Sequence, residues 1–423
     1  MSHKQAAMDS EARRGWVVVG TTFITLSLVI GVWYSYSVFL VAFLREFGWS
    51  RSLVAGSFSV FVLVHGAVSP IVGWLAGRVG PRRVILAGGC VLGCGLLLTA
   101  ETTAWWHLYL AFGGVTAVGL TMAGWLPAVV LVRGWFPGRF GTAMGITSAG
   151  IGVGIFTLVP FTQILIDGVG WRWAFRVLAV LILGWVLPAT ARLVRESPPP
   201  EVSDPSSTRQ SLPGLSPCGA QWTLATAVRD WHFWALAGVF FTGNFVTQML
   251  LVHQVAFLVD HGVSPLAAAW VGGLAGLVSI AGKIWCGAFS DRAGREVAYS
   301  LAFGCIVAGL GALVLAGRYP SSSLPYVYAI LIGLGYGGIA PIAPAAASDL
   351  FSGPAFSTIF GTVYPALCLG IASGAWVAGW IFDGTGGYAL AFWIALLMAV
   401  SSPALLWIVA PRRPNPAPVR WSS

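Results

Sequence analysis

Charged side chains are scarce in this chain. Asp, Glu, Lys and Arg together make up 9% of its 423 residues, whereas hydrophobic residues make up 57%. A water-soluble fold of this size needs many more polar side chains to cover its surface. The composition therefore excludes a soluble globular protein and predicts one that lies largely within a lipid bilayer.

The sequence also lacks the residue patterns of common catalytic and metal-binding sites. It contains six cysteines and six histidines, but neither a His-Glu-x-x-His motif nor a Gly-x-Ser-x-Gly motif. Cys90 and Cys94 lie in an apolar stretch without a histidine or carboxylate nearby, so we interpret the cysteines as small buried apolar residues. Basic and aromatic residues do not alternate on any polar segment, which argues against nucleic-acid binding. We expect no enzyme activity, no metal and no cofactor.

Long apolar runs make up most of the sequence, and each has about the 20 residues that a helix needs to cross a bilayer. They predict an all-α membrane protein with twelve transmembrane helices in two pseudo-symmetric six-helix bundles. The runs cover residues 16–43, 52–76, 84–100, 105–132, 140–166, 173–193, 232–259, 265–289, 296–317, 324–348, 356–382 and 388–410.

Polar segments divide these runs into two halves. Six prolines lie among serines and acidic residues between residues 197 and 219, a composition typical of a flexible linker, and residues 221–230 resemble a short surface helix. The predicted organisation is a cytoplasmic tail (1–14), an N-terminal bundle (15–195), a cytoplasmic linker (196–230), a C-terminal bundle (231–410) and a cytoplasmic tail (411–423).

The two halves repeat one short pattern. Gly73, Arg78 and Gly80 follow the second apolar run with the same spacing as Gly287, Arg292 and Gly294 follow the eighth. Duplicated halves built from apolar helices are typical of secondary transporters, in which two related bundles enclose a central site.

Positive charges predict the orientation in the membrane. With both termini in the cytoplasm, seventeen Lys and Arg residues lie on the cytoplasmic side and five on the outer side. Because positive residues remain cytoplasmic during insertion, this distribution predicts a multi-pass protein of the plasma membrane with both termini in the cytoplasm. The net charge of +9 fits this topology and attraction to anionic lipid. We expect the chain to function as a monomer.

Lys283 is the most informative single residue, because it is the only lysine beyond the N-terminal tail. It lies eight positions before Asp291, about 12 Å into the membrane at the helical rise. Facing lipid, a charge there costs at least about 2.5–3.5 kcal/mol, yet all fourteen acidic residues fall in tails, in loops or near helix ends. We infer that the missing anion is the substrate. The alternative is a neutral lysine, or one satisfied by carbonyls and hydroxyls such as that of Ser279.

Other polar and aromatic side chains within the apolar runs are further candidates. Asn244 and Gln248 share one helical face and can either bind a ligand or join helices. His65 and His253 are candidates for proton coupling, since imidazole titrates near physiological pH, although either can simply pack. Four further candidates for the substrate site carry a hydroxyl or an indole N–H, and they are Tyr34, Trp125, Tyr336 and Tyr364.

The repeated Gly-x-x-x-x-Arg-x-Gly pattern resembles the loop signature of the major facilitator superfamily. Gly15-Trp16 and the run RGWFPGRFGTAMGITSAG from Arg133 to Gly150 resemble the two signatures of its monocarboxylate transporter family, in the bacterial branch. The resemblance places Lys283 where that family has a substrate-binding arginine. It also implies three departures, since Ser279 replaces an aspartate, Tyr34 aligns with a lysine, and Gly77 replaces an acidic residue.

The loop signatures predict a gate at the cytoplasmic end. We expect Asp291 and Arg292 to form a latch that holds the outward-open state through charge-assisted bonds to a neighbouring helix end. Arg78 occupies the same place in the first half, where Gly77 should make the latch weaker.

Together these observations predict a secondary active transporter of a small organic anion, a monocarboxylate carried with a proton by alternating access. Lys283 is the first candidate for the proton as well, because burial disfavours its charged form and a bound carboxylate favours it. The alternatives are a carboxylate exchanger of the oxalate:formate type and a membrane sensor that does not transport.

Overall fold

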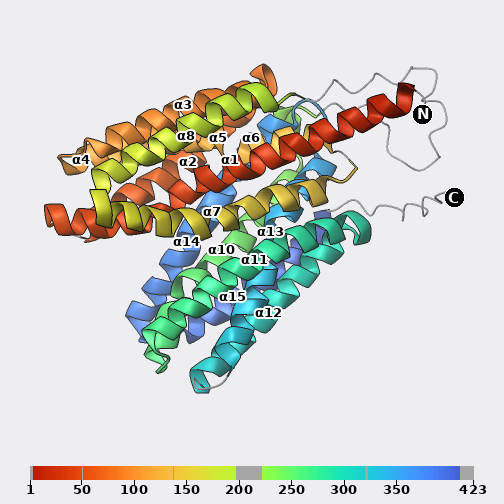
Figure 1. Cartoon of the computed structure of the whole chain (residues 1–423). Coiled ribbons are helices and arrows are strands. Elements are labelled where there is room, and N and C mark those ends of the chain that lie inside the picture. Colours follow the sequence, from red (N-terminus) through yellow and green to blue (C-terminus); the bar gives the residue numbers. More distant parts are fainter. Residues whose placement is uncertain (1–2, 50, 137, 197–221, 320–322, 410–423) are drawn as a thin grey trace.

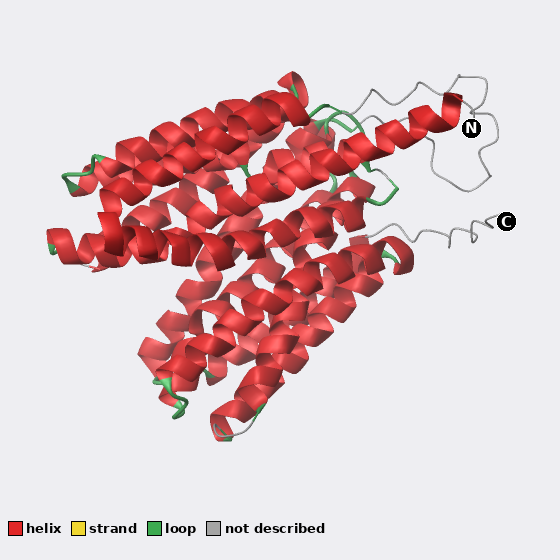
Figure 2. Cartoon of the chain, viewed as in Figure 1, coloured by secondary structure: helices red, strands yellow, loops and turns green. Residues whose placement is uncertain are grey.

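The computed structural model describes residues 3–49, 51–136, 138–196, 222–319 and 323–409. All regular secondary structure in this part of the chain is helical (Figure 2). The elements are α1 (His3–Phe47), α2 (Arg51–Val79), α3 (Pro81–Ala100), α4 (Trp105–Leu108), the π-helix η1 (Tyr109–Thr116), α5 (Ala117–Ala123), α6 (Trp125–Trp135), α7 (Phe140–Val169), α8 (Trp171–Leu193), α9 (Leu224–Arg229), α10 (Trp231–Asp260), α11 (Pro265–Ala293), α12 (Arg295–Arg318), α13 (Leu324–Leu350), α14 (Phe356–Thr385) and α15 (Ala389–Val409).

The helices form two bundles, α1–α8 and α10–α15 (Figure 1). Within the described residues, twelve helical segments are long and apolar enough to cross a membrane, six in each bundle, with α4 to α6 together forming one of them. The predicted fold class is therefore confirmed. Most of the predicted linker and all of the last tail lie outside the described residues, and the short predicted surface helix is α9.

Three details differ from the sequence-based expectation. Helix α1 begins at His3, inside the predicted tail, because the polar residues that precede the apolar run include good helix formers such as Ala, Gln and Glu. The predicted helix 105–132 is interrupted by η1 and by a break at Gly124. Cys90 and Cys94 are exposed on the outside of α3 rather than buried, so that interpretation was wrong for these two cysteines.

Two helix crossings join the bundles, α7 with α11 and α2 with α14. Both depend on glycine, since a Cβ atom on Gly287 would lie 2.3 Å from the Gly141 carbonyl oxygen, and one on Gly73 would lie 2.3 Å from the Ser357 carbonyl oxygen. Only residues without a side chain allow backbones to approach this closely.

The bundles converge at the end of the molecule where α1 begins and α15 ends, and they diverge toward the opposite end (Figure 1). We call the first of these the termini-bearing end. The bundles are thus in contact at the termini-bearing end and spread apart at the other (Figure 1).

Candidate functional site

A small cavity of about 130 Å³ lies between the bundles. The N-terminal bundle contributes residues of α1, α6 and α7 to its wall, and the C-terminal bundle contributes residues of α10, α13 and α14. Five of the predicted substrate-binding residues line this cavity, and they are Tyr34, Trp125, Asn244, Tyr336 and Tyr364. Ile30, Trp33 and Phe240 add apolar surface, so the wall suits a small ligand with an apolar body.

The break at Gly124 places Trp125 in the cavity wall. Gly124 has φ −96° and ψ −135°, which ends α5, and α6 starts at Trp125. Pro127 is the third residue of α6, where its missing N–H costs no hydrogen bond because the first helical amides have no partner within the helix. The indole of Trp125 is buried, with 7% of its surface exposed.

Two tyrosines from different bundles line the cavity. Tyr34 lies on α1 and Tyr336 on α13. On the opposite side of its ring, Tyr336 covers the ammonium of Lys283, whose Nζ atom lies 4.8 Å from the ring centroid. Tyr336 thus separates Lys283 from the cavity.

Lys283 is buried, with 1% of its surface exposed, and it is not part of the cavity wall. Its Nζ atom donates a hydrogen bond to Ser279 Oγ at 2.9 Å. Among the described residues no carboxylate forms an ion pair with it. A hydroxyl and an aromatic face satisfy an ammonium less well than an anion does, so Lys283 is poised to accept one.

The two candidate amide side chains differ in position. Asn244 lines the cavity and uses its amide nitrogen within α10, donating to the Phe240 carbonyl oxygen at 2.8 Å. Gln248 is half-buried one turn further along α10 and is not part of the cavity wall. The structure therefore brings Asn244 but not Gln248 to the site.

The two histidines also differ. His65 is buried directly behind the cavity wall, with Nδ1 2.8 Å from Thr121 Oγ1 and Nε2 3.4 Å from the hydroxyl of Tyr364. His253 lies away from the cavity, where Nε2 donates to the Ala375 carbonyl oxygen at 2.9 Å and Nδ1 lies 3.1 Å from the hydroxyl of Tyr388. The contacts of His253 are those of a packing residue.

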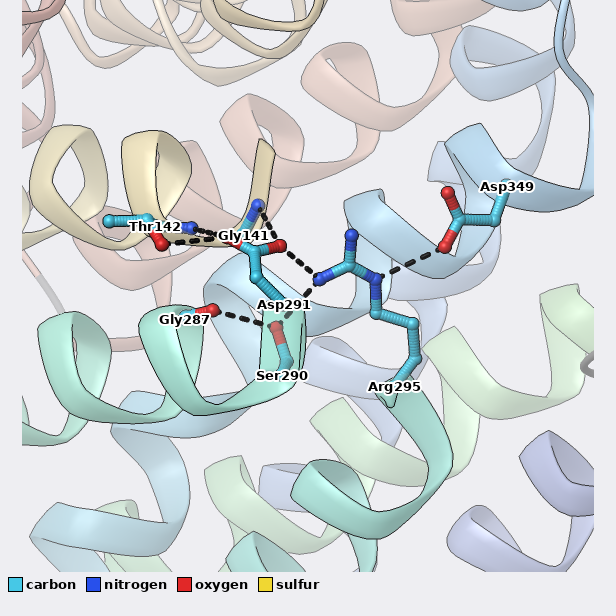
Figure 3. A network of polar contacts seen from close by, with 7 residues as sticks. All are labelled: Gly141, Thr142, Gly287, Ser290, Asp291, Arg295 and Asp349. Atoms are coloured by element: carbon cyan, nitrogen blue, oxygen red, sulfur yellow. Dashed lines mark hydrogen bonds and ion pairs between the residues drawn. The ribbon is translucent and has the colours of Figure 1, made fainter. Parts of the chain in front are cut away.

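The termini-bearing end is closed by a polar network centred on Asp291 (Figure 3). Its carboxylate accepts hydrogen bonds from the backbone N–H groups of Gly141 and Thr142, at 2.9 and 2.6 Å, and from Thr142 Oγ1 at 2.7 Å. A residue of α11 thereby caps the first turn of α7 in the other bundle, where the helix dipole favours negative charge.

Arg295 holds this carboxylate in place. Its Nη1 atom lies 2.5 Å from Asp291 Oδ1, and its Nε atom lies 3.1 Å from Asp349 Oδ2 on α13 (Figure 3). The predicted partner Arg292 is exposed and, within the described chain, forms no hydrogen bond or ion pair. Arg292 is the counterpart of Arg78 in the repeat, and Arg78 lies over the ring of Trp74 at 5.2 Å.

Sequence reasoning missed Arg295, Thr142 and Asp349. Arg295 directly follows Gly294 of the repeated pattern, so the pattern carried a signal for it. The contribution of Thr142 could not be foreseen, because it depends on how two helices from different bundles meet.

Twelve spanning helices in two bundles around a central cavity define a membrane carrier. The chain belongs to the Major Facilitator Superfamily, whose sequence profile matches residues 22–351. Over nearly the whole chain it is similar to the proton:xylose symporter XylE bound to 6-bromo-6-deoxy-D-glucose, with a TM-score of 0.70, 12% sequence identity and coverage of 95% of this chain and 97% of that one.

Relatives with higher sequence identity carry the name of one family of transporters. The chain is 28% identical to monocarboxylate transporter 13 of Rattus norvegicus, covering 90% of this chain and 85% of that protein. It is 26% identical to monocarboxylate transporter 2 of Homo sapiens, covering 88% and 80%. These relatives are transporters, which confirms the expected resemblance and the expectation that the chain is not an enzyme.

Proposed function

We propose that this protein carries a small monocarboxylate together with a proton across the membrane by alternating access. The observation that carries the proposal is the buried ammonium of Lys283, which has no carboxylate partner among the described residues and lies behind one aromatic ring of the cavity wall. The names of the relatives support the substrate class.

Substrate binding begins at the end of the structure where the two bundles diverge. The apolar body of the acid packs against Trp33, Trp125 and Phe240, and its carboxylate displaces the ring of Tyr336 and pairs with Lys283. With a proton on Lys283, this pairing is a charge-assisted hydrogen bond in a site of low dielectric, and it replaces the contact of Nζ with the Tyr336 ring. Tyr336 belongs to the C-terminal bundle and faces a wall that the N-terminal bundle shares, so its movement affects the contact between the bundles.

A proton accompanies the anion because Lys283 is buried. In the empty site, desolvation disfavours the ammonium form of Lys283, whereas the bound carboxylate favours it. Anion and proton therefore enter as a neutral pair. We further propose that the termini-bearing end faces the cytoplasm of a bacterial cell, that the inner membrane is its location and that the monomer is the transporting unit.

Uptake into proteoliposomes tests the proposal through Lys283. Lys283→Gln is expected to abolish uptake of a radiolabelled monocarboxylate, and Lys283→Arg to retain part of it, because arginine keeps the charge. Lys4→Gln is the matched control, since Lys4 is the only other lysine of the chain and lies far from the cavity in sequence. Normal uptake by Lys283→Gln would overturn the proposed site.

Uptake into the same vesicles distinguishes a symporter from the two alternatives, an exchanger and a sensor. A symporter takes up substrate into empty vesicles, an exchanger requires a carboxylate inside, and a sensor moves none in either case. We expect uptake into empty vesicles.

A further inference from the structure

The two crossings that join the bundles begin with similar helix starts but are closed differently. Helix α7 starts Phe140-Gly141-Thr142, and α14 starts Phe356-Ser357-Thr358. At α7, the second and third backbone amides and the threonine hydroxyl all donate to Asp291. The counterpart of Asp291 in the repeat is Gly77, which has no side chain to offer.

Gly77 faces the start of α14 at close range. A Cβ atom on Gly77 would lie 2.3 Å from Ser357 Oγ and 3.8 Å from Thr358 Oγ1. Thr358 stands at the position of Thr142, whose hydroxyl Asp291 binds at α7, and Ser357 stands at the position of Gly141 and adds a second hydroxyl. The crossing of α2 and α14 therefore repeats the arrangement without the carboxylate.

The start of α14 is capped only in part by the described chain. The amide of Phe356 donates to the Gly353 carbonyl oxygen at 3.2 Å, but the N-cap residue, Ala355, makes no side-chain hydrogen bond, and the next amides, of Ser357 and Thr358, have no partner within the helix. The hydroxyl of Ser357 is unpaired in the described structure, while only 3% of the residue is exposed. A buried polar group without a partner is costly, and it points to a ligand at this place.

A pocket of about 530 Å³ adjoins these groups, and Gly77 and Ser357 are part of its wall. Three arginines also line it, Arg78, Arg83 and Arg133, against one acidic residue, Glu196. The pocket thus combines a positively charged wall with the positive end of a helix dipole.

Two of these charged residues, Arg133 and Glu196, differ in their relation to α14. The guanidinium of Arg133 lies 4.0 Å from the ring centroid of Phe356, the first residue of α14, and its Nε atom donates to Ser348 Oγ at 2.6 Å. The carboxylate of Glu196 lies beside Gly80, at the start of α3, and forms no hydrogen bond with the described residues of α14. Glu196 therefore does not replace the missing acid.

We propose that this pocket binds a small oxyanion, a carboxylate or a phosphate, at the start of α14. The anion accepts hydrogen bonds from the hydroxyl of Ser357 and from the backbone amides of Ser357 and Thr358, the positions in α14 that match the amides of Gly141 and Thr142 bound by Asp291 at α7. It completes the second crossing and so stabilises closure of the termini-bearing end. The inference does not depend on which solute the central cavity carries.

Thermal unfolding of the purified full chain in detergent tests the site, with inorganic phosphate as the probe and chloride at equal ionic strength as the reference. Phosphate is expected to raise the unfolding midpoint in a saturable manner. Ser357→Ala should weaken the apparent affinity by about tenfold, because it removes one hydrogen bond to a charged group. Thr362→Val is the matched control, since the Thr362 hydroxyl bonds within α14 to the Thr358 carbonyl oxygen.

Gly77→Asp supplies the missing carboxylate and should abolish the response to phosphate. Arg192→Gln changes an exposed arginine at the same end and should leave the response unchanged.

Titration with acetate in the Lys283→Gln background tests free carboxylates without a contribution from the central cavity. In nanodiscs, a response to phosphatidylglycerol that removes the response to free phosphate would assign the site to a lipid headgroup.

An unfolding midpoint that neither phosphate, acetate nor phosphatidylglycerol raises would overturn the proposal. So would equal responses of the wild type and Ser357→Ala, or a full response to phosphate in Gly77→Asp. Ser357→Ala keeps the proposal open to refutation if Gly77→Asp does not fold, because alanine only removes an oxygen atom.

Discussion

The amino group of Lys283 has two partners among the described residues, the hydroxyl of Ser279 and the aromatic face of Tyr336. Ser279, one turn earlier on α11, stands where the monocarboxylate transporter family has an aspartate, as the sequence resemblance implies. An aspartate there would neutralise the lysine within the protein. The serine leaves the charge available for a substrate anion.

Tyr336 provides a first prediction at this scale. Tyr336→Phe keeps the ring over Lys283 and loses only the hydroxyl, so uptake should remain within a few-fold of the wild type. Tyr336→Ala removes the ring that the carboxylate has to displace and opens the path from the cavity to Lys283, which should lower the KM for the carboxylate by about threefold or more. Kinetics of uptake into proteoliposomes provide the measurement, and equal KM values for the two variants would contradict this role.

The histidines provide a second prediction. His253→Ala should leave proton-driven uptake intact, because both ring nitrogens bond to groups away from the cavity, and should lower stability by about 1–3 kcal/mol through the loss of the two hydrogen bonds to Tyr388 and Ala375. Thermal unfolding and uptake, measured on the same preparation, check both parts. His65→Ala is likewise expected to retain coupling, and its loss there would move the proton site from Lys283 to His65.

At the scale of helices, the network around Asp291 joins α7 of the N-terminal bundle to α11 of the C-terminal bundle. Asp291→Asn keeps the size of the side chain but removes its charge, so hydrogen bonds worth about 1.5–3 kcal/mol each fall to about 0.5–1.5 kcal/mol. The carrier should then shift toward the state that is open at the termini-bearing end. Labelling of Ala343→Cys from that end, in a cysteine-free background, should increase.

Arg292→Gln is the matched control for this latch, since Arg292 is exposed and outside the network. Equal labelling in Asp291→Asn and Arg292→Gln would show that the network does not hold the closed state.

The glycine crossings make a further prediction. A side chain at Gly287 would meet the Gly141 carbonyl oxygen at 2.3 Å, and backbone cannot yield as a flexible side chain does. Gly287→Val should therefore prevent closure of the termini-bearing end and abolish net uptake while the protein still reaches the membrane. Gly304→Val, at a glycine with nothing within 4 Å of a Cβ atom, should transport normally.

For the whole molecule, hydrophobic runs and the internal repeat were sufficient to predict twelve helices in two bundles, because helices that cross a bilayer must satisfy their own backbone and be apolar outside. The wall of the cavity was predictable in part. Tyr34, Trp125 and Tyr364 stood out as polar groups in apolar helices, but residue spacing could not show that Tyr336 shields Lys283 or that Gln248 lies outside the wall. Those facts depend on how separate bundles meet.

The network at the termini-bearing end shows the same limit. Asp291 was identifiable from the repeated pattern, but its partners come from two other helices, α7 and α12, and sequence spacing does not specify contacts between distant elements. The sequence therefore predicts Arg292 as a member of the latch, whereas Arg295 has this role in the structure.

Coupled movement of a monocarboxylate and a proton is the central claim of this account, and transport by purified protein in sealed vesicles tests it most directly. Uptake of radiolabelled carboxylate is measured under an imposed pH gradient, with and without a potassium diffusion potential. We predict uptake that an inwardly directed proton gradient drives, that a membrane potential leaves unchanged, and that Lys283→Gln abolishes. Uptake that persists unchanged when the pH gradient is collapsed would contradict it.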